Sequence, residues 1–117
     1  MEEKLLYKDI SYRIQGVLFE AHNKLGRYCN EQQVCDYLKQ CFDKACIKNE
    51  WQKILPPSVE GEVMGRNRVD FLVENQVVLE IKCKRFLTKE DYYHTKRYLV
   101  ALNKTLGILV NFRDQRL

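Results

Sequence analysis

The stretch that decides the fold is residues 68–82, which read RVDFLVENQVVLEIK. Every second residue from 69 to 73 is apolar, and the same alternation returns from 77 to 81. A period of two predicts strands that each bury one face. With a three-residue loop at 74–76, Phe71 lies opposite Leu79 and Val69 lies opposite Ile81. Because the apolar pairs then all fall on one face, the sequence predicts an antiparallel hairpin in this register.

The same register brings two acidic residues together on the other face. Asp70 is placed across from Glu80, and Lys82 follows two residues later on the same side of its strand. Carboxylates whose Cβ atoms are about 5 Å apart repel each other unless a cation lies between them. Since the ligands are oxygens, with no His or Cys in the triplet, the pattern favours Mg²⁺ or Mn²⁺ over Zn²⁺.

These three side chains are the minimum equipment for metal-dependent hydrolysis of a phosphodiester. The ion would polarise a phosphoryl oxygen and generate hydroxide from water. Lys82 could stabilise the developing phosphate charge or, if burial lowers its pKa, position or deprotonate the attacking water. The alternative is an exposed ladder whose surface ion pairs contribute about 0 to 1 kcal/mol. Spacing alone does not decide between the two.

The flanking sequence predicts the remaining elements. Apolar residues at three- and four-residue intervals predict helices over about residues 5–24 and 30–45. Thr88 and Asp91 resemble a capping box that opens a third helix, which reaches about Asn103. Residues 47–55 and 106–112 are predicted as strands, the first at an edge because Pro56-Pro57 cannot continue into a central strand.

This order of elements, ααβββαβ, predicts an α/β sandwich around a central, mixed, four-stranded sheet. An antiparallel hairpin is followed by a helical crossover to a parallel strand. With 117 residues, no internal repeat and no linker, the chain is expected to form a single domain over residues 1–117.

Composition excludes several classes of protein. The chain is 45% hydrophobic and 31% charged, which is typical of a globular domain and not of a disordered one. No apolar run approaches the ~18 residues of a membrane span, and Met1-Glu-Glu-Lys does not begin a signal peptide, so we expect a cytoplasmic protein. The five cysteines form no CxxC pair, which argues against a disulfide framework and a zinc ribbon.

The positive charge is concentrated in the second half of the chain. Residues 1–63 carry 9 basic and 10 acidic side chains, a net charge of −1, whereas residues 64–117 carry 11 and 6, a net charge of +5. Between residues 82 and 104, seven basic side chains face only Glu90 and Asp91. Such clustering suits a polyanionic partner, although charge alone favours a solvated basic face.

The spacing of Asp70 from Glu80-Ile81-Lys82 resembles the active-site signature of the PD-(D/E)XK nuclease superfamily. The whole chain from Gly16 to Phe112 is similar to the GxxExxY family within it. The similar segments are residues 20–26 (EAHNKLG), Glu31, residues 68–74, residues 78–82, Tyr98-Leu99 and residues 107–112 (GILVNF). Each motif is short, but their order and spacing together are specific. The resemblance implies a restriction-endonuclease-like fold.

The resemblance also implies roles for individual residues. Asp70 and Glu80 match the metal ligands, Lys82 matches the catalytic lysine, and Glu31 matches the glutamate of the family name and could reach the same ion or a second one. The expected substrate-binding residues are Lys84, Arg85, His94, Arg97 and Tyr98.

Three positions depart from the family pattern. Its glycine falls on Tyr28, its tyrosine falls on Val34, and the glutamine of the superfamily's QxxxY motif falls on His94, four residues before Tyr98 and on the same face of a helix.

The leading hypothesis is therefore a Mg²⁺- or Mn²⁺-dependent nuclease acting on DNA, with the basic cluster holding backbone phosphates. A homodimer would extend its short cleft. The second hypothesis is a nucleic-acid-binding module that keeps the fold without turnover, given the altered positions 28, 34 and 94. A weaker third is a protein-partner module without nucleic-acid chemistry. Tyr92 and Tyr93 could stack on bases, but core packing of Tyr92 against Leu99 and Leu106 is the expected use.

Overall fold

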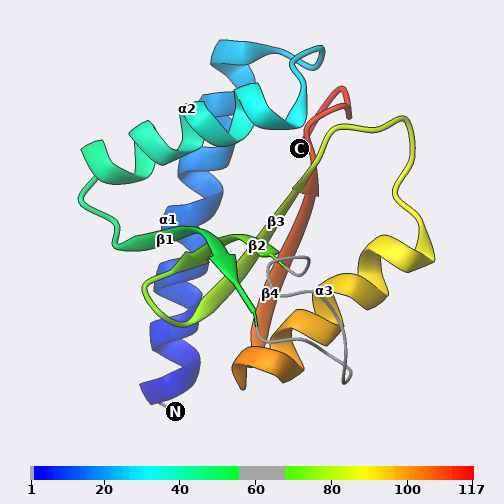
Figure 1. The fold of residues 1–117 in the computed structure, drawn as a ribbon. Helices are drawn as coiled ribbons and strands as arrows, with labels where there is room; N and C mark the ends of the chain where they lie inside the picture. The colour runs from blue at the N-terminus through cyan, green and yellow to red at the C-terminus, as the bar shows by residue number, and fades with distance from the viewer. Residues whose placement is uncertain (1, 56–67) are drawn as a thin grey trace.

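A computed structural model describes residues 2–55 and 68–117, with side chains from Tyr7 onward. The elements occur in the predicted order, ααβββαβ (Figure 1). They are α1 (Glu2–Leu25), α2 (Glu31–Lys44), β1 (Asn49–Ile54), β2 (Arg68–Val73), β3 (Val77–Lys82), α3 (Lys89–Leu102) and β4 (Leu106–Asn111). The strands form one sheet in the order β1-β2-β3-β4, in which β1, β2 and β3 are antiparallel and β4 runs parallel to β3. The predicted mixed sheet is confirmed.

The sheet is covered on both faces. Figure 1 shows α1 and α2 on one side of it and α3 on the other. On the first side, residues such as Ile14, Leu38 and Phe42 are buried in one cluster with Phe71 and Leu79 of the hairpin. On the second side, a smaller cluster of Leu55, Val69, Leu72 and Val78 packs against Tyr98, Leu99 and Leu102 of α3. The hairpin is therefore buried from both sides, which is what fixes its position.

The predicted hairpin register is confirmed near the turn. Val73 pairs with Val77 and Phe71 pairs with Leu79. The turn is closed by the Gln76 amide, which donates to the Val73 carbonyl at 3.0 Å. Glu74 and Asn75 adopt φ angles of 53° and 55°, the two positive values that let a tight turn match the twist of its strands.

The sheet departs from the predicted register at Asp70. The pairing of β2 with β3 stops at Phe71, and the pairing of β2 with β1 passes from Trp51–Phe71 to Lys53–Val69 without the pair between them. Gln52, which would pair with Asp70, has a φ angle of 53°. The sequence predicts that Val69 shares a face with Phe71 and Ile81. This prediction is wrong, because Val69 is buried in the cluster beneath α3. The regular pairing is interrupted beside Asp70, so strict alternation ends there.

The third helix begins and ends at the residues that the sequence indicates. The Thr88 hydroxyl accepts a hydrogen bond from the Asp91 amide, and the Asp91 carboxylate accepts one from the Thr88 amide, which is the predicted capping box. Asn103 ends the helix in a left-handed conformation. Because the cap fixes where the helix starts, it also fixes which residues of α3 face the sheet.

The structure also bears on the edge strand, on the cysteines and on membrane-spanning helices. β1 lies at the edge of the sheet, as predicted, while Pro56-Pro57 falls outside the described residues. All five cysteines are free thiols. No helix within the described ranges has the length and apolar character to cross a lipid bilayer.

Replacing Phe71 by Ala tests whether the hairpin is the centre of the core. Phe71 is fully buried and packs edge to face against Phe42, with ring centroids 5.3 Å apart. We expect the free energy of unfolding, measured by urea denaturation, to fall by roughly 3 to 5 kcal/mol. Phe86→Ala is the matched control, because Phe86 is 71% exposed and its loss should change stability by about 0.5 kcal/mol at most. Equal losses in the two variants would contradict this description of the core.

Candidate active site

The carboxyl groups of Asp70 and Glu80 each accept a backbone hydrogen bond across the point where the sheet opens. The amide of Asp70 donates to Oε1 of Glu80 at 3.0 Å, and the amide of Ile81 donates to Oδ2 of Asp70 at 2.7 Å. Side-chain oxygens thus replace the carbonyl groups that would accept these bonds in a regular ladder. The predicted pair is brought together, and each carboxyl is held by the backbone of the opposite strand.

Both carboxyl groups are difficult to ionise in this position. Burial, and then the negative charge of Asp70, together raise the pKa of Glu80 to about 8. Burial also raises the pKa of Asp70 to about 6, although the hydrogen bond from Ile81 opposes the shift. Only 4% of Glu80 is exposed. Two such groups are stabilised in their charged forms by a cation placed between them.

Lys82 lies on the same strand as Glu80 and is half-buried. Its positive charge lowers the pKa of both carboxyl groups, which places the ammonium within electrostatic reach of the pair. In the parts of the chain that the structure describes, Lys82 makes no ion pair with a carboxylate. No carboxylate of the described residues therefore neutralises its charge through an ion pair.

Glu31 is the first residue of α2 and is exposed. Its negative charge raises the pKa of both Asp70 and Glu80, so the start of α2 approaches the pair. Within residues 2–55 and 68–117, however, no three His, Cys, Asp or Glu side chains are arranged to hold a metal ion. The structure thus brings the carboxyl groups of Asp70 and Glu80 together, and Glu31 lies farther from them.

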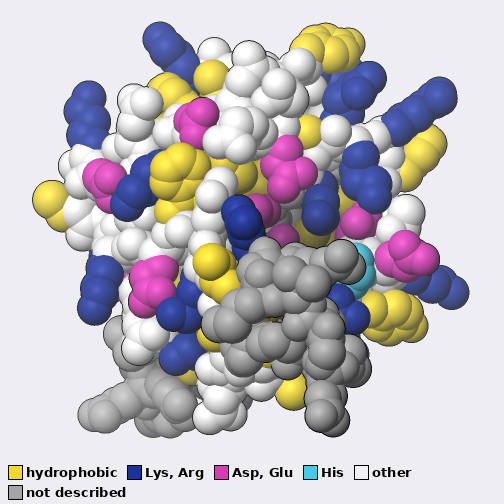
Figure 2. Space-filling view, in the orientation of Figure 1, with side chains coloured by type: hydrophobic (Ala, Val, Ile, Leu, Met, Phe, Trp, Pro, Cys, Tyr) yellow, Lys and Arg dark blue, Asp and Glu magenta, His cyan; other side chains and the backbone are white. Residues whose placement is uncertain are grey.

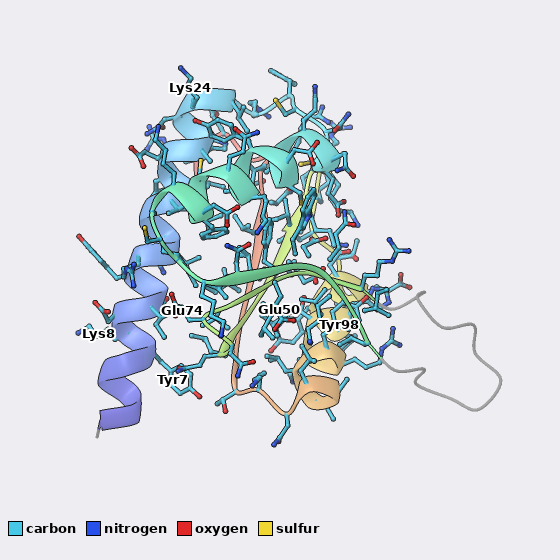
Figure 3. The ribbon with its side chains drawn as sticks, turned by 60° about the vertical axis from the view of Figure 1, so that its left-hand side comes forward. Tyr7, Lys8, Lys24, Glu50, Glu74 and Tyr98 are labelled. Carbon is cyan, nitrogen blue, oxygen red and sulfur yellow. The ribbon has the colours of Figure 1, made fainter. Side chains whose placement is uncertain are left out.

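The opposite wall of the site comes from α3. Tyr98 projects from this helix toward the sheet (Figure 3), where it packs beneath the cluster of Leu72 and Val78. Burial and then the negative charge of Glu80 raise the pKa of Tyr98. His94 stacks on Tyr98, with ring centroids 6.5 Å apart and planes at 23°. The two residues share a helix face, as predicted, and His94 itself is exposed.

Lys84 lies in an ion pair that sequence reasoning did not anticipate. Its ammonium is 2.9 and 3.1 Å from the two carboxylate oxygens of Asp91. Burial would raise the pKa of Asp91, but the hydrogen bonds from Lys84 and Thr88 overcome this effect and lower the pKa to about 2. The ion pair joins the loop after β3 to the cap of α3. A basic residue predicted to contact substrate thus also holds the loop in place.

Asn111 is a residue of the site that was not predicted from the sequence. It is buried, its side-chain oxygen accepts a hydrogen bond from the Lys84 amide at 3.1 Å, and its side-chain nitrogen donates to the Lys84 carbonyl at 2.7 Å. The sequence signal that could have identified Asn111 is its place as a polar residue at the end of an apolar strand. Asn111 therefore fixes the segment that follows Lys82.

The remaining predicted residues lie on the surface. Arg85 and Arg97 are exposed, and the charge of Arg97 acts on Tyr98. Figure 2 shows acidic side chains recessed in the middle of this face, with Lys and Arg side chains around them. The expected core packing of Tyr92 is wrong, because 54% of this residue is exposed and the aromatic ring lies under Lys96 on the surface.

The chemistry of the pair fits a hard divalent cation. One oxygen of each carboxyl is used by a backbone amide, and within the described segments the second oxygen of each receives no such bond. Mg²⁺ is commonly held by one or two carboxylates, with water and phosphate oxygens completing its shell. Asp70 and Glu80 would be those two ligands. Among the residues that the structure places, no further carboxylate, His or Cys joins them in a metal-binding group, which is compatible with this mode of binding.

Comparison with known proteins assigns the chain to a family. A family model for the PD-(D/E)XK nuclease superfamily matches residues 8–117. Searches of curated proteins and of solved structures gave no significant match. Because the match extends over nearly the whole chain, the protein belongs to the PD-(D/E)XK nuclease superfamily, whose fold agrees with the architecture described above.

The raised pKa values predict how stability depends on pH without metal. A carboxyl whose pKa is higher in the folded than in the unfolded state costs stability once it ionises, so the free energy of unfolding should fall as pH rises from about 4 to about 8. Asp91, with its lowered pKa, acts in the opposite direction and only at lower pH. We expect Glu80→Gln to reduce the loss, measured by urea denaturation in EDTA.

Glu90→Gln is the matched control for this experiment. Glu90 is exposed, and its replacement should leave the pH profile parallel to that of the wild type. If the Glu80→Gln profile is also parallel to that of the wild type, ionisation of the Asp70–Glu80 pair does not destabilise the fold and this prediction is contradicted.

Proposed function

We propose that the protein is a metal-dependent nuclease that hydrolyses phosphodiester bonds in DNA. Membership of a superfamily made up largely of nucleases supports the reaction class. The observation that carries the proposal is the Asp70–Glu80 pair, which is buried, hydrogen-bonded across two strands and difficult to ionise. A structural ion pair would place a basic group between them, and no such contact occurs among the described residues.

The residues divide the work of hydrolysis among them. Asp70 and Glu80 would hold the cation, which supplies Lewis-acid polarisation of a phosphoryl oxygen and makes water a better nucleophile. The backbone bonds from Ile81 and Asp70 fix the two carboxyl groups, so little reorganisation is needed when an ion binds. Lys82 presents its ammonium to the charge that develops on the phosphate, or orients the attacking water.

Several residues around the pair support nucleic acid as the substrate. The half of the chain from residue 64 onward carries a net charge of +5. Arg85, Arg97 and His94 are exposed near the site and would contact backbone phosphates. Lys84 would act less directly, because its ion pair with Asp91 orients the loop that carries Arg85. Tyr98 would pack behind the carboxylates.

The finer parts of the proposal rest on sequence. We propose that the protein is a GxxExxY family member, that residues 1–117 form one domain, and that Glu31 serves as a more distant metal ligand. Mg²⁺ or Mn²⁺ is the proposed ion because the ligands are oxygens. A cytoplasmic location and a homodimer remain predictions.

A second candidate is a nucleic-acid-binding module without turnover. The position of the family tyrosine is occupied by Val34, which is fully buried in the core and cannot contact a substrate. The position of the superfamily glutamine is occupied by His94, which stacks on Tyr98. If these changes abolish catalysis, salt-sensitive binding of DNA would remain.

Purified protein should cleave DNA in the presence of Mg²⁺ or Mn²⁺ and not in EDTA. We expect Lys82→Ala to lower the cleavage rate by roughly 10²- to 10³-fold, the usual effect of removing one group that stabilises transition-state charge. Lys8→Ala is the matched control, since Lys8 is an exposed lysine on α1 and lies outside the basic cluster, and it should retain nearly full activity.

Calorimetric titration with Mn²⁺ separates the two candidates. A nuclease should bind the ion and lose that binding in Asp70→Ala. If neither single- nor double-stranded DNA nor RNA is cut, and Asp70→Ala does not alter metal binding, the nuclease proposal is wrong. DNA binding that persists in the Asp70→Ala and Glu80→Gln variants, with no product at any metal concentration, would establish the binding module instead.

A further inference from the structure

Tyr28 lies exposed in the connection between α1 and α2, and the guanidinium groups of two arginines lie against its ring. It is 78% exposed. The guanidinium carbons of Arg27 and Arg113 lie 5.3 and 5.5 Å from the ring centroid. Arg27 also donates a hydrogen bond from Nε to the Arg113 carbonyl at 3.1 Å. A large aromatic surface and two positive charges are therefore fixed together at the end of the sheet.

Phe86 forms a similar unit on the loop after β3. It is 71% exposed, and the guanidinium carbon of the neighbouring Arg85 lies 5.6 Å from its ring centroid. The loop that carries it is anchored from both sides, by Asn111 through the backbone of Lys84 and by the ion pair of Lys84 with Asp91. Phe86 is thus an exposed apolar side chain next to a segment held by buried hydrogen bonds.

Both units lie at the end of the sheet that carries the candidate active site. The Phe112 amide, next to Arg113, donates to the carbonyl of Lys82 at 2.8 Å. The loop of Phe86 begins directly after Lys82, and the charge of Glu31, three residues after Tyr28, acts on Asp70 and Glu80. Segments far apart in the sequence therefore converge around the catalytic lysine. Figure 1 shows the start of α2, the end of β3 and the C-terminus close together.

An exposed aromatic ring beside a guanidinium group is suited to an unpaired nucleotide. A base stacks on the ring while the arginine contacts its phosphate or stacks on the base itself. In a duplex the faces of the bases are already covered by their neighbours, so such a ring would find no partner there. Core packing does not explain either side chain, because more than two thirds of each is exposed.

We propose that Tyr28 and Phe86, with Arg27, Arg113 and Arg85, bind the unpaired bases of single-stranded nucleic acid at the mouth of the site. This inference rests on the proposed nuclease function and specifies its substrate class. Tyr28 takes the place of the family glycine in the resemblance described above, so the Tyr28 unit is a property of this chain's own sequence.

The test compares two strands that have the same phosphates. One is a labelled, non-self-complementary DNA strand of about 15 nucleotides, and the other is an abasic strand of the same length. Fluorescence anisotropy is measured in EDTA, where no metal-dependent cleavage occurs. The wild type should bind the strand with bases at least roughly tenfold more tightly than the abasic strand, since stacking contributes about 1 to 3 kcal/mol per base. A blunt duplex of the same length should also bind less tightly.

The variants assign this preference to the two rings. Tyr28→Ala and Phe86→Ala should each weaken binding of the strand with bases by roughly fivefold or more and leave abasic binding unchanged. Tyr28→Phe should bind as the wild type does. Tyr28→Leu keeps an apolar side chain against the arginines but lacks a ring, so it should behave as Tyr28→Ala. Tyr12→Ala is the matched control, because Tyr12 is 77% exposed on the middle of α1, and it should have no effect.

The outcomes distinguish this inference from the proposed function. Equal affinity for the two strands, equal affinity for the duplex, or no binding at all would overturn the stacking proposal, even if the protein cleaves duplex DNA with Mg²⁺. Conversely, a preference for bases that depends on Tyr28 and Phe86, in a protein that cuts nothing, would support the binding surface and reject the nuclease.

Discussion

The two hydrogen bonds from the amides of Asp70 and Ile81 to the carboxyl groups of Glu80 and Asp70 are the constraint on which the site depends. Every backbone amide buried in a sheet needs an acceptor, and at this point the acceptors are carboxylate oxygens from the facing strand. This solution opens the sheet without leaving amides unpaired. It also forces two acidic groups into one buried place. A cation between the two groups would relieve their repulsion, which follows from how the strands are joined.

The rest of the fold resists the repulsion that this arrangement creates. Directly behind the pair, Phe71, Leu79 and Ile81 are fully buried against α1 and α2. On the other side, α3 is held by its capping box and by the ion pair of Asp91 with Lys84. A site that is unfavourable without its ligand can persist only where the surrounding structure fixes it. The small size of the chain leaves this hairpin as the centre of both the core and the site.

Sequence predicts those parts of the structure whose causes are local. The alternation in residues 68–82 predicts the hairpin, Thr88 with Asp91 predicts the helix cap, and the carboxylates are correctly brought together. The opening of the sheet at Asp70 is not predicted, because it depends on the conformation of Gln52 in another strand and on side-chain bonds across the hairpin. For this reason the predicted position of Val69 is wrong. The contact of Tyr28 with Arg113 is likewise invisible in sequence, since 84 residues lie between them.

A crystal soaked in Mn²⁺ tests most directly whether Asp70 and Glu80 form a cation site. We expect an anomalous difference peak between the two carboxyl groups, with oxygen ligands from both and the remaining positions filled by water. A soaked crystal with no peak there, or with Lys82 forming an ion pair with both carboxylates in its place, would contradict this expectation.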